Sequence, residues 1–162
     1  MTQTTPAYDT QTLPADVAAG AAQFLTPMVL DLEALVVNGK QLHWHVRGGS
    51  FAGVHTLLDD VVAHAQDFAD TAAERVIALG LPVDSRLQAV AAKATLPELP
   101  AGFLGWEATV EHAVAQLDAA LATVRAAITG LDEVDLSSQD IAIAIEQGLT
   151  KDRWLLQAHV AS

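Results

Sequence analysis

The sequence contains no cysteine among its 162 residues. This absence excludes disulfide bonds, thiolate metal sites and thiol catalysis. Aromatic residues make up only 5% of the chain although hydrophobic residues make up 51%, so the apolar content is mainly alanine, valine and leucine. Small and straight-chain apolar residues favour closely packed helices, and the chain is long enough to form one domain with its own core.

Basic residues are also scarce. The chain carries 8 Lys and Arg against 20 Asp and Glu, which gives a formal net charge of −12 at pH 7. Such a charge argues against nucleic acid as the default partner and suits a protein that attracts cations. No apolar run reaches the roughly 18 residues of a membrane span, and the first residues lack the basic and apolar segments of a signal peptide. We therefore expect a cytoplasmic protein without a membrane partner.

The spacing of apolar residues predicts four long helices and one short one, with no strand. The predicted helices cover residues 14–47, 50–80, 84–94, 103–129 and 138–160. This pattern predicts an all-α four-helix bundle with the short helix in the connection between the second and third long helices. We expect one such domain over residues 13–162, preceded by a flexible N-terminal tail at residues 1–12.

Local signals predict how the first two helices begin and end. Pro27 predicts a kink or a fresh start within the first helix. Gly48 and Gly49 predict its end, and Ser50 is the expected N-cap of the second helix.

The second predicted helix carries two pairs of metal donors on one side. At 100° per residue, His55, Asp59, Asp70 and Glu74 fall within a band of about 100° at the edge of the apolar stripe, whereas His64 lies on the opposite, solvated face. Residues four apart in a helix are neighbours, so each pair can chelate a cation. The midpoints of the pairs lie about 22 Å apart along the axis, however, so they cannot share one ion within a chain.

A two-fold axis brings the two pairs together. If two copies of the helix lie antiparallel, one register places His55 opposite the partner subunit's Glu74 and Asp59 opposite the partner subunit's Asp70. A symmetric interface of this kind creates two identical sites. His43, at the end of the preceding helix, can add a second imidazole to each site.

The complete donor set is two imidazoles and three carboxylates. Nitrogen and oxygen ligands without sulfur suit Fe(II), Mn(II) or Zn(II). Each pair taken alone is more commonly a surface hydrogen bond or a solvated acidic face. The complementary register and the additional imidazole of His43 make a shared metal site the favoured interpretation.

These residues lie within two segments that resemble a known family. HWHVRGGSFAGVHTLLDD at residues 43–60, followed by DTAAERVIALG at residues 70–80, resembles the Dps family, the miniferritins named as DNA-binding proteins from starved cells. The shared pattern is His-Trp, an Arg-Gly turn, Phe, His and Asp, and later Asp, Ala-Glu-Arg and Leu-Gly. DIAIAIEQGLTKDRW at residues 140–154 resembles the last helix of the family more weakly.

The resemblance implies a ferritin-like four-helix bundle that assembles into a hollow dodecamer. It implies that this homo-oligomer oxidises Fe(II), typically with hydrogen peroxide and otherwise with dioxygen, and stores Fe(III) as a mineral core, which protects the cell from oxidative stress. It also implies that each ferroxidase site holds two iron ions. Carried over residue by residue, the implied ligands are His43, His55 and Asp59 of one subunit and the partner subunit's Asp70 and Glu74. Trp44 is the implied aromatic residue beside the site that passes or quenches electrons.

Three alternatives stand beside this interpretation. A DNA-binding nucleoid protein is suggested by the family name, but family members that bind DNA often use basic tails, and residues 1–39 contain no Lys or Arg. A metal-dependent hydrolase is more remote, because the sequence shows no separate general base or substrate pocket. A plain structural bundle predicts no stoichiometric metal binding.

A few further residues have assigned roles. In the acidic segment around residues 132–140, Asp140 is the candidate for an iron-uptake pore if the protein forms a cage. Trp106 and Trp154 are interpreted as packing residues.

Overall fold

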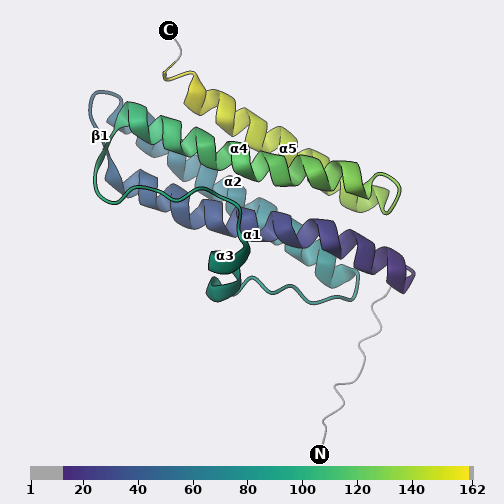
Figure 1. Ribbon diagram of the computed structural model, residues 1–162. Helices are drawn as coiled ribbons and strands as arrows, with labels where there is room; N and C mark the ends of the chain where they lie inside the picture. The colour runs from purple at the N-terminus through teal and green to yellow at the C-terminus, as the bar shows by residue number, and fades with distance from the viewer. Residues whose placement is uncertain (1–12, 161–162) are drawn as a thin grey trace, which may run out of the picture.

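Four long helices lie side by side in the computed structural model, which describes residues 13–160 (Figure 1). They are α1 (Ala15–His45), α2 (Phe51–Ala78), α4 (Trp106–Leu131) and α5 (Leu136–Gln157). The short helix α3 (Leu87–Lys93) lies in the connection between α2 and α4 and packs against α1. The predicted all-α four-helix bundle is confirmed. The predicted tail at residues 1–12 lies outside the described residues.

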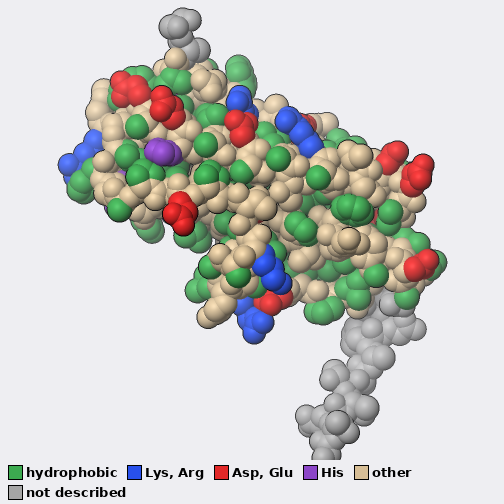
Figure 2. Space-filling model, in the orientation of Figure 1, with side chains coloured by type: hydrophobic (Ala, Val, Ile, Leu, Met, Phe, Trp, Pro, Cys, Tyr) green, Lys and Arg blue, Asp and Glu red, His purple; other side chains and the backbone are tan. Residues whose placement is uncertain are grey.

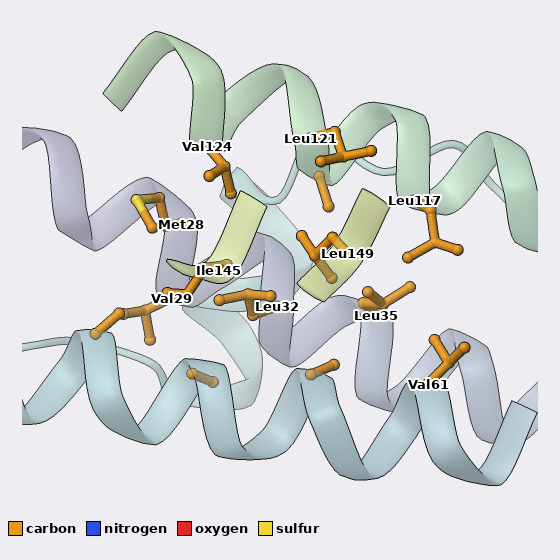
Figure 3. Close-up of a cluster of buried hydrophobic side chains, with 14 of the residues drawn as sticks. Met28, Val29, Leu32, Leu35, Val61, Leu117, Leu121, Val124, Ile145 and Leu149 are labelled. Atoms are coloured by element: carbon orange, nitrogen blue, oxygen red, sulfur yellow. The ribbon is translucent and has the colours of Figure 1, made fainter. Parts of the chain in front are cut away.

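The core lies between the four long helices, where each helix buries one apolar stripe. α1 packs against α2 and α4, and α5 completes the bundle by packing against the same two helices. Figure 3 shows Leu32, Leu35, Leu121 and Leu149 pointing into this shared interior. Each is at most 2% exposed, and burying a leucine side chain stabilises a fold by about 1.5–3 kcal/mol.

The expectation of no strand is wrong in one small place. β1 (Val46–Arg47) pairs in parallel with β2 (Leu104–Gly105), so that the two residues after α1 lie beside the two residues before α4. Each strand has two residues, which is too short to produce a periodic pattern in the sequence. The pair fixes the start of α4 next to the turn between α1 and α2.

Three predicted helix signals have different outcomes. Pro27 lies inside α1, which continues as one helix through this position. α1 ends at His45, a little before the two glycines that were predicted to end it. Gly48 instead forms the turn toward α2: it has a φ of 111°, and a Cβ atom there would lie 2.9 Å from Cδ1 of Trp106. Ser50 is the N-cap residue of α2, as predicted, although its side chain makes no capping hydrogen bond.

A buried carboxylate ties the connection after α3 to the bundle. Asp31 in α1 is 1% exposed and accepts hydrogen bonds from the backbone N–H of Thr95 at 2.6 Å and from its hydroxyl at 2.7 Å. The Thr123 hydroxyl of α4 donates to the same carboxylate at 2.6 Å. Asp31 therefore joins α1, α4 and the connecting segment at one point.

The two tryptophans interpreted as packing residues differ. Trp106 packs against the core, as expected. Trp154 is 63% exposed on α5, so its interpretation as a packing residue is wrong. It faces outward because α5 buries Leu149, Asp152 and Leu156 on its opposite side.

Two core helices have the length and composition of membrane spans. An 18-residue window has a mean hydropathy of 1.4 in α1 and of 1.2 in α4. Within these windows, 50% and 44% of the residues are buried in the bundle. This is weak support for a membrane span, because core helices of a bundle have the same composition.

Candidate metal centre

His43 and His55 are locked together where α1 ends and α2 begins. Nδ1 of His43 lies 2.8 Å from the carbonyl oxygen of His55, and Nδ1 of His55 lies 2.9 Å from the carbonyl oxygen of His43. The two rings stack with their centroids 3.6 Å apart and their planes 22° from parallel. The chain reversal at Gly48 makes this reciprocal arrangement possible.

The reciprocal bonds select one tautomer of each imidazole. A carbonyl oxygen only accepts hydrogen bonds, so Nδ1 of each ring carries the hydrogen and donates it. The lone pair on Nε2 of each ring is then free. Histidines that bind metals usually have their other ring N–H held by a carbonyl or carboxylate in this way. His43 and His55 thus both have the tautomer that a metal ligand bound through Nε2 requires.

Asp59 lies one helical turn after His55 and carries the third donor of this group. Its Oδ1 atom lies 3.5 Å from Nδ1 of His43, and the same oxygen accepts a hydrogen bond from Nζ of Lys40 in α1. The hydrogen bond from Lys40 is the main reason that the pKa of Asp59 lies below its usual value, and the nearby charges of His43 and Lys40 contribute to the shift. The carboxylate is therefore a charged donor at neutral pH.

Asp70 and Glu74 lie further along α2, apart from the two histidines. Both are exposed, on the side of the helix that also carries His55 and Asp59. Asp70 lines a polar depression of about 500 Å³ together with Glu33 of α1. Within residues 13–160, no group of three or more His, Cys, Asp or Glu side chains is arranged to enclose a metal ion. One chain thus brings His43, His55 and Asp59 near one another without enclosing a metal ion, and it leaves Asp70 and Glu74 exposed farther along α2.

The remaining candidate residues lie on the surface. Trp44 is 65% exposed and follows His43 directly in the last turn of α1. Asp140 is exposed in the second turn of α5.

His64 has a partner that the sequence pattern did not reveal. Its Nδ1 lies 3.0 Å from both carboxylate oxygens of Asp152, which comes from α5 and is 3% exposed. Burial raises the pKa of Asp152, and the hydrogen bond with His64 partly opposes this shift. The pair links α2 to α5 on a different face from His55.

The chain belongs to the ferritin-like domain family, which it matches over residues 29–162. Within this family it is similar to several Dps proteins. The structure of Dps from Microbacterium arborescens in the high iron form is 58% identical, with a TM-score of 0.90, and the match covers 94% of this chain and 99% of that one. The resemblance predicted from the histidine-rich segment is thereby confirmed.

Two curated relatives are more distant. The DNA protection during starvation protein of Agrobacterium fabrum is 30% identical over 149 residues, covering 91% of this chain and 92% of that protein. DNA protection during starvation protein 2 of Deinococcus radiodurans is 29% identical over 155 residues. This chain spans only 62% of the length of the Deinococcus protein.

Proposed function

We propose that the protein oxidises Fe(II) at sites shared between two-fold related subunits and stores the product as Fe(III) mineral inside a hollow homo-oligomer. The observation that carries this proposal is the reciprocal bonding of His43 and His55, which leaves the Nε2 lone pair of each ring free, with the charged Asp59 3.5 Å from Nδ1 of His43. The outward-facing Asp70 and Glu74 supply the remaining ligands to the partner subunit. Twelve subunits is the assembly that the family resemblance implies.

Iron is the substrate, and the proposed chemistry balances with two ions per site. The two stacked imidazoles are proposed to supply one ligand each to a pair of ions, and paired metals in enzymes lie about 3.5–4 Å apart. Two Fe(II) ions each give one electron to hydrogen peroxide. The O–O bond breaks, two protons are taken up, and two water molecules form. Because both electrons go to one peroxide, no hydroxyl radical is released, and the cell is protected from oxidative stress.

The protein's own groups have separate tasks in this scheme. The carbonyl groups of residues 43 and 55 hold the imidazoles in the metal-binding tautomer. The carboxylates neutralise the arriving cations. Trp44, exposed beside the site, is proposed to pass or quench electrons that leave the iron pair singly. The exposed Asp140 is proposed to line a pore through which Fe(II) reaches the interior.

DNA protection in the names of relatives does not require DNA binding by this chain. The net charge of −12 opposes binding to phosphate, and no Lys or Arg occurs before Lys40. On the face drawn in Figure 2, Lys and Arg side chains are scattered among acidic ones and form no continuous basic patch. Removal of Fe(II) and peroxide in the cytoplasm is the proposed route to protection.

Iron loading followed by size measurement tests the proposal. We expect protein incubated with Fe(II) and then hydrogen peroxide to elute as a particle of many subunits by size-exclusion chromatography with light scattering. Iron analysis of that peak should find many more iron atoms than subunits. A parallel sample given Zn(II) and peroxide should retain only a few ions per chain. A monomer or dimer carrying at most two iron ions per chain would contradict the storage function.

A further inference from the structure

His64 on α2 is the only exposed histidine in residues 13–160. Its Nδ1 lies 3.0 Å from both oxygens of Asp152 on α5, a side chain that is 3% exposed. A carboxylate only accepts hydrogen bonds, so Nδ1 carries the hydrogen and Nε2 keeps its lone pair. The imidazole itself is 47% exposed. Because Nδ1 is held by the buried carboxylate, Nε2 is the ring nitrogen left for a ligand from outside.

The negative charge of Asp152 is poorly balanced within the chain. Burial is the main cause that raises the pKa of Asp152, and the nearby charge of Asp60 raises it further. The hydrogen bond with His64 opposes this shift, whereas the charge of Lys151 has the smallest effect. A neutral imidazole supplies a hydrogen bond but no positive charge, and a buried charge without an opposite charge is costly. A cation bound on the exposed side of His64 would offset that cost.

Asp60 supplies a second donor on the same face of α2. It precedes His64 by four residues and both are exposed, so their side chains are neighbours one helical turn apart. At 100° per residue, the two lie about 40° apart around the helix and about 140–180° away from His55. The effect of Asp60 on the pKa of Asp152 independently places it close to the pair. These three residues therefore meet on a face separate from the proposed iron site.

We propose that His64 and Asp60 bind one divalent transition-metal ion, such as Zn(II) or Fe(II), and that Asp152 holds the imidazole in the metal-binding tautomer. Imidazole and carboxylate are ligands that such ions take where thiolates are absent. A carboxylate on the other ring nitrogen is a common support for a ligating histidine. Within the described residues no three such side chains enclose an ion, so water completes the coordination and the ion can exchange. This site does not depend on the proposed function.

Calorimetric titration of the whole protein with Zn(II) tests the site. Zn(II) is the probe because it does not change oxidation state, and the titration uses a background variant, His43→Ala with His55→Ala, that lacks both imidazoles of the proposed iron site. In this background, we expect one ion per chain to bind and His64→Gln to weaken its binding at least about tenfold. Asp152→Asn keeps His64 but removes the buried charge, and it should weaken binding about tenfold. His112→Gln, which changes a histidine on α4, should match the background.

The wild-type protein provides a check that needs no background variant. In equilibrium dialysis against saturating Zn(II), His64→Gln should retain one ion per chain fewer than the wild type, and His112→Gln should retain the same number. Loss of one ion in His64→Gln, together with weaker binding in Asp152→Asn, would support the proposal. Equal Zn(II) binding by His64→Gln and its parent would overturn the site. Weaker binding in His64→Gln but not in Asp152→Asn would overturn the role of the buried carboxylate.

Discussion

Replacing His55 and Asp59 together with alanine is expected to slow peroxide-driven Fe(II) oxidation by at least about 100-fold. Loss of a residue that merely supports a ligand typically costs 10–100-fold in metal affinity or activity, and this variant removes two ligands. The change leaves His43 without its ring contact and without the adjacent carboxylate. Stopped-flow absorbance of Fe(III) after anaerobic loading is the measurement.

A matched variant distinguishes loss of the site from damage to the fold. His112→Ala with Asp16→Ala removes the same residue types from α4 and from the first turn of α1, and it should oxidise iron at the wild-type rate. Circular dichroism should show the same helix content for both variants. Unchanged oxidation in His55→Ala with Asp59→Ala would refute the ligand assignment.

The largest expected effect on stability comes from Asp31→Ala. This change leaves the Thr95 and Thr123 donors without the carboxylate that accepts three hydrogen bonds. Hydrogen bonds to charged groups contribute about 1.5–3 kcal/mol each, and the carboxylate that accepts these three is buried. We therefore expect the free energy of unfolding, measured by urea denaturation, to fall by about 3 kcal/mol or more.

Asp118→Ala is the control for the Asp31 variant. Asp118 pairs with Arg153 between α4 and α5, and their side chains are 49% and 36% exposed. Exposed ion pairs contribute about 0–1 kcal/mol, so this variant should remain close to the wild type. Equal losses in the two variants would show that the buried position of Asp31 does not matter.

The bundle was predictable because its helices are long and their apolar spacing is regular. Gly48 was recognisable as a turn residue, because glycine readily adopts the positive φ that many turns require. In the structure it does have a positive φ. Pro27 was not a reliable sign of a break in the helix, because buried neighbours such as Leu25 and Met28 hold α1 together on both sides of it. The pairing of β1 with β2 joins segments that are far apart in the sequence, and two-residue strands have no pattern to detect.

The candidate site was predictable in its residue types but not in its internal contacts. Helical spacing placed His55 and Asp59 on one side of α2. The exchange of hydrogen bonds between His43 and His55 depends on the path of the turn between two helices, which the spacing does not determine. The Lys40 to Asp59 pair had a signal that was missed, because Lys40 lies one turn before His43 on α1. The His64 to Asp152 pair joins residues 88 positions apart, and no signal in the sequence indicated it.

Mixing two inactive variants tests most directly whether each site is built from two chains. His55→Ala with Asp59→Ala removes one half of every site, and Asp70→Asn with Glu74→Gln removes the other half. If the chains are co-assembled in equal amounts, half of the two-fold pairs are mixed and each mixed pair contains one intact site. The mixture is expected to recover about one quarter of the wild-type oxidation rate. A mixture as inactive as its two components would contradict a site shared between subunits.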